Sequence, residues 1–193
     1  MRNKVCVSCF LGFFIICIAV SCGDDDFYLP KPESYFRIDL PEKQYEPTSL
    51  DLPFSFEKPV FSIIQNRENV NQFNLVFPLH KAKIHFTYFS LENQEIQPFL
   101  EDAYNYAYKH NLKATAINTF SHKLDSSRVY GLSYELKGDV ASPLQFFATD
   151  SVSHFLRGAL YFDHSPNADS IAPVLEYIEV DIEQLYKTLE WKE

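Results

Sequence analysis

The chain has 193 residues, enough for a domain that buries its own core, and carries 26 acidic against 17 basic residues, a net charge of −9. This acidic excess argues against nucleic-acid binding and against attraction to an anionic membrane surface. The five glycines form neither a G-x-G-x-x-G fingerprint nor a Walker A loop, which argues against the common nucleotide sites.

The N-terminus has the layout of a secretion signal. Arg2 and Lys4 precede an apolar run, Val5 to Val20, of about 16 residues. A permanent transmembrane helix needs about 20 apolar residues, and the polar segment that follows ends this run early. We therefore expect residues 1–21 to be a cleaved signal peptide.

Cys22 follows the small residues Ala19 and Ser21, which is the lipobox arrangement of bacterial lipoproteins. All four cysteines lie within the first 22 residues, so only Cys22 would survive cleavage and no disulfide could form. We expect Cys22 to be lipidated, with acyl chains that contribute about 0.8 kcal/mol per buried methylene. The alternative is a signal peptide that ends at an ordinary cysteine.

Residues 23–34 are expected to form a tether between the lipidated Cys22 and the domain. They lack a periodic pattern, and they would reach roughly 40 Å when extended. Loss of Arg2 and Lys4 leaves 17 − 2 = 15 basic residues against 26 acidic ones, so the mature chain would carry −11. Membrane contact should therefore come through the lipid.

The first part of the domain predicts short strands. Residues 35–40, 54–56, 61–64 and 73–77 are short apolar segments, and prolines between them favour edge strands and turns. The segment 83–89 alternates clearly and predicts a full strand whose inward side chains are Ile84, Phe86 and Tyr88.

The period changes to that of an amphipathic helix between Asn93 and His110. Asn93 is the expected N-cap, and Pro98 is tolerable only in the first turn. Asn111 is expected to end the helix in the left-handed conformation. The apolar stripe of this helix consists of Ile96, Phe99, Leu100, Ala103, Tyr106 and Ala107.

Four strand patterns follow, with short turns between them. They cover residues 114–120, 129–136, 144–149 and 155–162. Consecutive strands with short connections predict an antiparallel meander.

A long helix closes the chain after the capping segment Ser165 to Ser170. Its apolar stripe is Ile171, Leu175, Ile178, Ile182, Leu185 and Leu189. The opposite side holds Glu176, Glu179, Glu183, Lys187 and Glu190, which we interpret as a solvated face in preference to a partner surface.

These elements predict one α+β domain over residues 35–193, an antiparallel sheet with a middle helix and a long C-terminal helix. The order of elements is similar to the Mog1/PsbP-type architecture, an analogy of fold that carries no function.

The sequence offers no convincing catalytic, metal or cofactor site. The segment 131–135 departs from the G-x-S-x-G elbow at its last position. The polar cluster 150–157 holds an acid, hydroxyls and an imidazole, but residues across a tight turn rarely converge as a triad, so we expect local hydrogen bonds. The six histidines show no zinc-ligand spacing. Arg157 is expected to pair with a carboxylate or a carbonyl.

Several long motifs carry a family resemblance. They are Pro30 to Pro32 with Tyr35 to Lys43, Lys137 to Phe147 with His154 to Phe162, and Pro166 to Pro173. With them the chain resembles the gliding motility lipoprotein GldD family of Bacteroidetes, and only Glu33-Ser34, where Lys-Gly is expected, departs from the pattern. The resemblance implies a non-enzymatic accessory of gliding motility and the linked type IX secretion system.

The same resemblance implies other envelope lipoproteins of that apparatus as partners, with no nucleic acid and no evident small-molecule substrate. The periplasmic side of the outer membrane is the favoured location, with the cell surface or the inner membrane as alternatives. Asp24 to Asp26 resemble surface-export signals of some lipoproteins, or are a solvated spacer. The alternative function is a lipid-anchored binding module or hydrolase that uses the 150–157 cluster.

We predict a partner surface made of Phe146, Phe147, Phe155 and Arg157, because aromatic residues and arginine are enriched at interface centres. Phe146 and Phe147 point to opposite faces of their strand. The alternative is that helices cover both faces and that the whole segment is internal packing.

Overall fold

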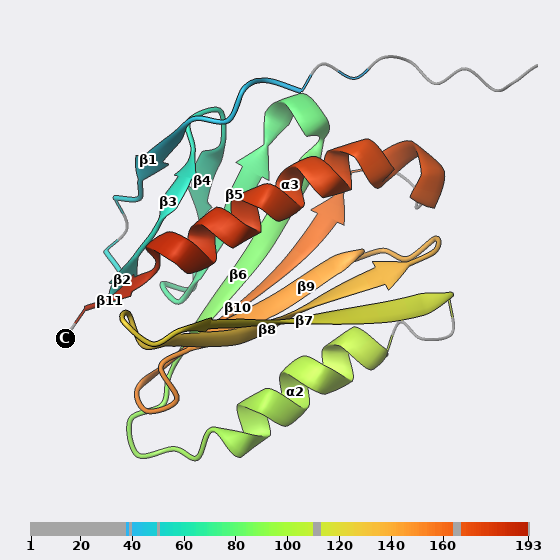
Figure 1. The fold of residues 1–193 in the computed structure, drawn as a ribbon. Helices are drawn as coiled ribbons and strands as arrows, with labels where there is room; N and C mark the ends of the chain where they lie inside the picture. The colour runs from blue at the N-terminus through green and yellow to red at the C-terminus, as the bar shows by residue number, and fades with distance from the viewer. Residues whose placement is uncertain (1–37, 39, 50, 110–112, 164–166, 193) are drawn as a thin grey trace, which may run out of the picture. The chain divides into compact units, whose positions relative to one another are not determined.

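The computed structural model describes residues 38, 40–49, 51–109, 113–163 and 167–192. Its main feature is a seven-stranded antiparallel sheet with the order β4-β5-β6-β10-β9-β8-β7 (Figure 1). These strands are β4 (Ile63–Asn66), β5 (Gln72–Phe77), β6 (Ala82–Ser90), β7 (Ala116–Leu124), β8 (Val129–Lys137), β9 (Leu144–Thr149) and β10 (His154–Phe162). The last four form the expected antiparallel meander.

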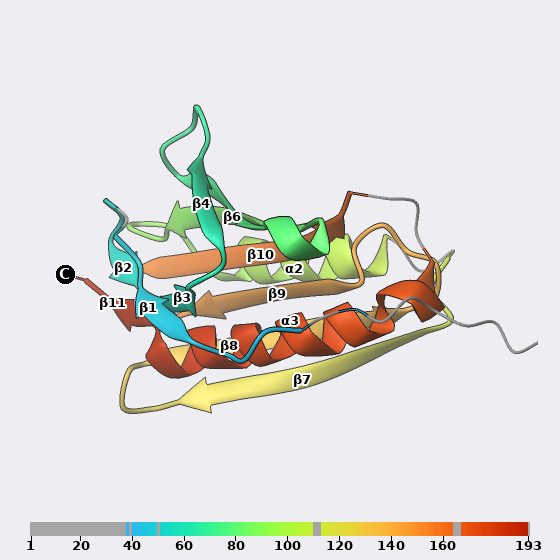
Figure 2. The same cartoon turned by 90° about the horizontal axis from the view of Figure 1, so that it is seen from above.

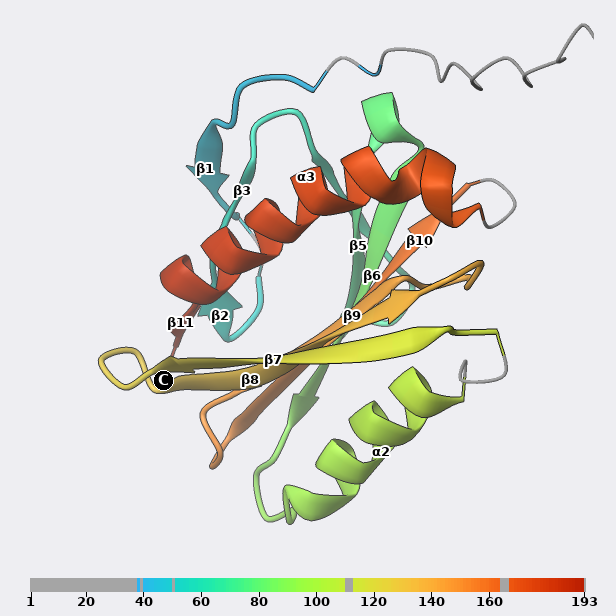
Figure 3. The ribbon, with the colours of Figure 1, turned by 45° about the vertical axis from the view of Figure 1, so that its right-hand side comes forward.

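Two helices lie on opposite faces of the sheet. Helix α3 (Ala168–Thr188) crosses one face, and α2 (Gln97–Tyr108) packs against the other (Figure 3). Strand alternation sends Phe146 into the cluster under α3 and its neighbour Phe147 into the cluster under α2. The expected α+β class, with a middle helix and a long C-terminal helix, is confirmed.

The described residues also form two small ladders, and the second of these joins an early segment to the end of the chain. Strand β1 (Tyr45–Pro47) pairs with β3 (Glu57–Pro59), and β2 (Phe54–Ser55) pairs with β11 (Glu190–Trp191). Phe54 is fully buried, and its ring lies 6.0 Å from that of Trp191 in an edge arrangement. The segment after α3 is therefore fixed to the early part of the domain.

Most expected elements are present. Strand β6 buries Ile84, Phe86 and Tyr88 as predicted, and the predicted apolar stripe of α3 is buried. Asn167 caps α3, because its side chain accepts a hydrogen bond from the backbone N–H of Ser170. Pro98 lies in the first turn of α2, as predicted.

Other details of the prediction are wrong. Asn93 does not cap α2, which begins later, with Ile96 as its N-cap, while Asn93 itself has φ of 60°. Ile38 and Leu40, the described residues of 35–40, are not in a strand. Asn111, Cys22, the signal segment and the tether lie outside the described residues. Within the described part of the chain, no helix combines the length and apolar character that a membrane span requires.

Candidate functional site

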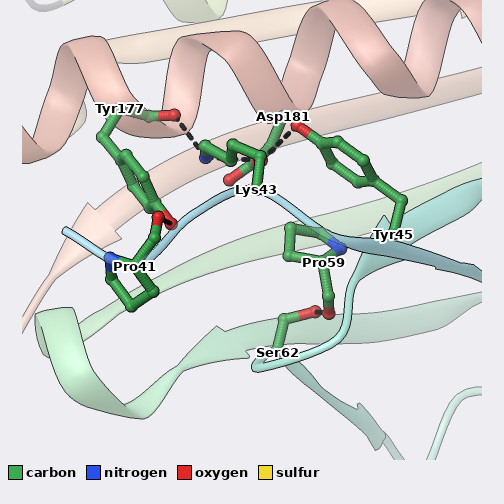
Figure 4. Close-up of polar contacts among 7 residues, drawn as sticks. All are labelled: Pro41, Lys43, Tyr45, Pro59, Ser62, Tyr177 and Asp181. Atoms are coloured by element: carbon green, nitrogen blue, oxygen red, sulfur yellow. Dashed lines mark hydrogen bonds and ion pairs between the residues drawn. The ribbon is translucent and has the colours of Figure 1, made fainter.

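Lys43 connects the segment before β1 to the middle of α3. Its ammonium group lies 2.6 Å from Oδ1 of Asp181 and donates a hydrogen bond of 2.7 Å to the carbonyl of Tyr177 (Figure 4). The Tyr45 hydroxyl donates to the same Asp181 oxygen at 3.0 Å. The Tyr177 hydroxyl donates to the carbonyl of Pro41 at 2.7 Å. Residues 41–45 are thus held on α3 by side chains of this segment and by side chains of the helix.

Burial dominates the electrostatics of this junction. It lowers the pKa of Lys43 and raises that of Asp181, and the direct contact between the two groups opposes both shifts. The Lys43 nitrogen also lies 3.2 Å from the centre of the Tyr177 ring, a cation–π contact. With a carboxylate, a carbonyl and a ring around it, this ammonium group has a structural role.

The polar cluster 150–157 is a turn stabilised from within. Oδ1 of Asp150 accepts hydrogen bonds from the backbone N–H groups of Val152, Ser153 and His154, at 3.0, 2.8 and 2.9 Å. Burial alone would raise the pKa of Asp150, but these donors hold it below its usual value. The expectation of local hydrogen bonding is confirmed.

The side chain of His154 in this cluster contacts residues outside the turn. Its Nδ1 lies 2.8 Å from the Tyr88 hydroxyl, and its ring stacks on Trp191 with centroids 5.0 Å apart. The imidazole therefore braces β10 against β6 and the C-terminal strand β11. This geometry gives no nucleophile and base pair within 150–157.

The predicted partner surface is wrong for its three phenylalanines. Phe146, Phe147 and Phe155 are only 1, 5 and 1% exposed. Phe146 packs under α3, whereas Phe147 and Phe155 stack on each other under α2. Each face of the sheet is covered by its own helix, which was the alternative interpretation.

Arg157 is half-buried and faces rings. Its guanidinium carbon lies 4.3 Å from the centre of the Tyr106 ring and 5.8 Å from that of Phe89. The expected partner was a carboxylate or a carbonyl, and stacking on aromatic rings takes that place because α2 brings Tyr106 over β10.

A groove between β7 and α3 contains a cavity of about 370 Å³. Its apolar lining comes from Phe120, Leu144 and Ile182. Its polar lining comes from His122, Ser133, Glu179 and Glu183. We refer to these seven residues as the β7–α3 groove.

His122 and Ser133 meet in this groove from neighbouring strands. The His122 Nε2 lies 2.8 Å from the Ser133 hydroxyl, and the imidazole stacks on Tyr186 with centroids 3.8 Å apart. Burial lowers the pKa of His122, which favours the neutral ring. A hydroxyl beside a neutral imidazole is one part of a nucleophilic site, which also needs an oriented base and an oxyanion hole.

Sequence patterns alone do not reveal this pair. The two residues are 11 positions apart and come together because the register places His122 opposite Gly131 and Phe120 opposite Ser133. The alternation of both strands is visible in the sequence, but the register between them is not.

Glu179 departs from the predicted solvated face of α3. Burial raises its pKa to about 7, and repulsion from Glu135 adds to the shift. Lys137 opposes it, while Glu176 and Glu183 contribute further in the upward direction. The expectation of a fully solvated acidic face is therefore wrong at Glu179, because that side of α3 leans over the groove.

Among the described residues, no group of three or more histidine, cysteine, aspartate or glutamate side chains is placed to hold a metal ion.

The solved structure of the Saccharomyces cerevisiae Ran-binding protein Mog1p matches 77% of this chain and 96% of its own, with 9% identity and a TM-score of 0.49. No curated protein matches the sequence at a significant level. The family model described as gliding motility lipoprotein GldD matches residues 25–191. This match spans most of the chain, which therefore belongs to the GldD family of gliding motility lipoproteins.

Proposed function

We propose that the protein is a lipid-anchored, non-enzymatic accessory of the gliding motility machinery and of the linked type IX secretion system. The observation that carries the proposal is the family match over residues 25–191. The use of polar side chains supports it, since Asp150 caps a turn and Lys43 and Asp181 hold the N-terminal segment on α3. Such groups stabilise a scaffold and are not available for a reaction.

The anchor is proposed to be the lipid on Cys22. In a gliding bacterium that lacks its own copy, the wild-type chain should restore colony spreading and export of a type IX cargo. A Cys22→Ser variant of equal abundance should restore neither, and it should leave the detergent phase on partitioning. A processed Cys22→Ser protein that partitions like wild type would contradict lipidation, and full spreading would contradict the need for an anchor.

The proposed location is the periplasmic side of the outer membrane, with the cell surface and the inner membrane as alternatives. Separation of the two membranes on a density gradient, followed by protease treatment of intact cells, distinguishes the three. The proposed partners are other lipoproteins of the apparatus, and crosslinking in living cells before affinity purification identifies them.

A lipid-anchored hydrolase is the second candidate, and the contact between His122 and Ser133 is the observation that favours it. Under the accessory proposal, Ser133→Ala at normal abundance leaves spreading and secretion intact. Complete loss of both at normal abundance would favour the hydrolase. The 150–157 cluster no longer supports this alternative, because its carboxylate is bound by the backbone of its own turn.

A further inference from the structure

Within the described part of the chain, strand β7 is an open edge of the large sheet. It pairs with β8 on one side and ends the strand order, and Figure 2 shows it along one margin of the described fold, beside α3. It spans nine residues, mostly exposed, of which Lys123 is the one with a full charge. Proteins commonly protect long edges with charges, prolines or a covering element, because an open edge pairs with other strands.

The direction of the free backbone groups follows from two hydrogen bonds. Leu136 of β8 donates its N–H to Pro143 beside β9, and the carbonyl of Lys137 accepts from Thr115 beside β7. Alternate residues of a middle strand bond to opposite neighbours, so the odd-numbered residues of β8 face β7. The register then directs the N–H and C=O groups of Thr119 and Ser121 toward the open edge.

The groove beside this edge holds two carboxyl groups over an apolar floor. Glu179 and Glu183 come from successive turns of α3, and Phe120 and Ile182 supply apolar surface next to them. Glu135 and Glu176 add to the negative field around Glu179.

Nearby cations neutralise this field only in part. Lys137 is already paired with Glu135, and Lys187 lies 3.6 Å from Glu183 in an exposed pair. His122, with its lowered pKa, is mainly neutral at pH 7. The side chain that complements such a site is a long cation with an apolar stem, which is a lysine or an arginine.

We propose that the β7–α3 groove binds an extended segment of a partner protein, which pairs with the edge of β7 and places a lysine or arginine beside Glu179 and Glu183. This combines strand addition for affinity with a charged pocket for specificity. The proposal rests on the accessory function above, because it states the chemistry of one partner.

The probe is a labelled, end-capped nonapeptide of alternating threonine and valine with a central lysine, compared with the same peptide carrying norleucine there. Binding to the full chain in detergent is measured by fluorescence polarisation at pH 8, where Glu179, with its pKa raised to about 7, is mainly ionised. We expect the lysine peptide to bind at least about tenfold more tightly, a ratio typical of a close charge pair, and to lose this advantage with Glu179→Gln/Glu183→Gln. The matched control, Glu95→Gln/Glu190→Gln, removes two exposed carboxylates that neither line the groove nor act on Glu179, and it should bind like wild type.

A second variant tests strand pairing. Thr119→Pro removes an N–H that points to the open edge, so the fold should persist by circular dichroism while both peptides bind more weakly. Equal affinity of the two peptides, unchanged binding by the Glu179→Gln/Glu183→Gln variant, or an edge occupied by a second copy of the chain would overturn the proposal. None of these outcomes depends on colony spreading, so the accessory function can fail or stand separately.

Discussion

The ammonium nitrogen of Lys43 lies 2.6 Å from Oδ1 of Asp181, across 138 positions of sequence. The Asp181 side chain is 2% exposed and that of Lys43 is 20% exposed, so the pair is largely shielded from water. A buried ion pair contributes little net stability when compared with apolar residues, but loss of one partner leaves the other charge without compensation. The pair therefore favours one position of the N-terminal segment on α3, because any position that separates the two groups leaves a buried charge without a partner.

Lys43→Met should destabilise the fold strongly. The substitution keeps most of the side-chain volume and, among the described residues, leaves the buried Asp181 carboxylate with the Tyr45 hydroxyl as its remaining donor. We expect a loss of about 3 kcal/mol in the free energy of unfolding, the lower end for a buried pair that loses one member. Urea unfolding of the full chain, followed by the fluorescence of Trp191, measures it.

Two companion variants make this test specific. Lys187→Met removes a lysine from an exposed pair with Glu183 and should cost less than about 0.5 kcal/mol. Adding Asp181→Leu to Lys43→Met should recover part of the loss, because no buried charge then remains. A Lys43→Met protein as stable as Lys187→Met would show that the contact between Lys43 and Asp181 does not contribute to the stability of the fold.

Asp150→Ala should weaken the turn between β9 and β10. The substitution removes an oxygen that accepts three backbone hydrogen bonds, so we expect a loss of about 2 kcal/mol. Asp150→Asn keeps an acceptor at the same place and should lose less than half of that. Thermal unfolding at pH 7 ranks the two variants, and equal losses would mean that the charge and not the acceptor geometry matters.

Local patterns predicted the elements that depend on local chemistry. The alternation of residues 83–89 and the helical stripe from Ile171 to Leu189 need only neighbouring positions, and both are buried as expected. The capping segment Ser165 to Ser170 was recognisable for the same reason, and within it Asn167 is the cap. The prediction that Asn93 caps the helix was wrong because this residue takes a positive φ before the helix begins. Asparagine adopts this left-handed conformation more readily than most residues, so the same residue type suits either role.

The site could not be predicted because it depends on the register between strands and on which helix covers each face of the sheet. Whether Phe146 and Phe147 are both internal depends on α2 covering the second face of the sheet, which strand patterns do not specify. The contact between Lys43 and Asp181 joins the two ends of the domain. Glu179 has the sequence spacing of a solvated residue, and only the nearness of β7 and β8 to α3 changes its environment.

Glu179 should make stability depend on pH. Its pKa is raised from 4.5 to about 7 in the folded state, chiefly by burial, so the folded protein keeps a proton that the unfolded chain has lost. The stability from this group is therefore fully present below pH 4.5 and declines as the pH rises through 7.

Glu179→Gln mimics the protonated form and should match wild type at pH 4. At pH 8 it should be more stable than wild type by about 1 to 2 kcal/mol, since solvent around the half-buried carboxyl reduces the full effect. Glu190→Gln, at an exposed position just after the same helix, should show no such gain. Urea unfolding of the three proteins at both pH values tests this, and a Glu179→Gln protein no more stable than Glu190→Gln at pH 8 would mean that Glu179 ionises there as freely as an exposed carboxylate.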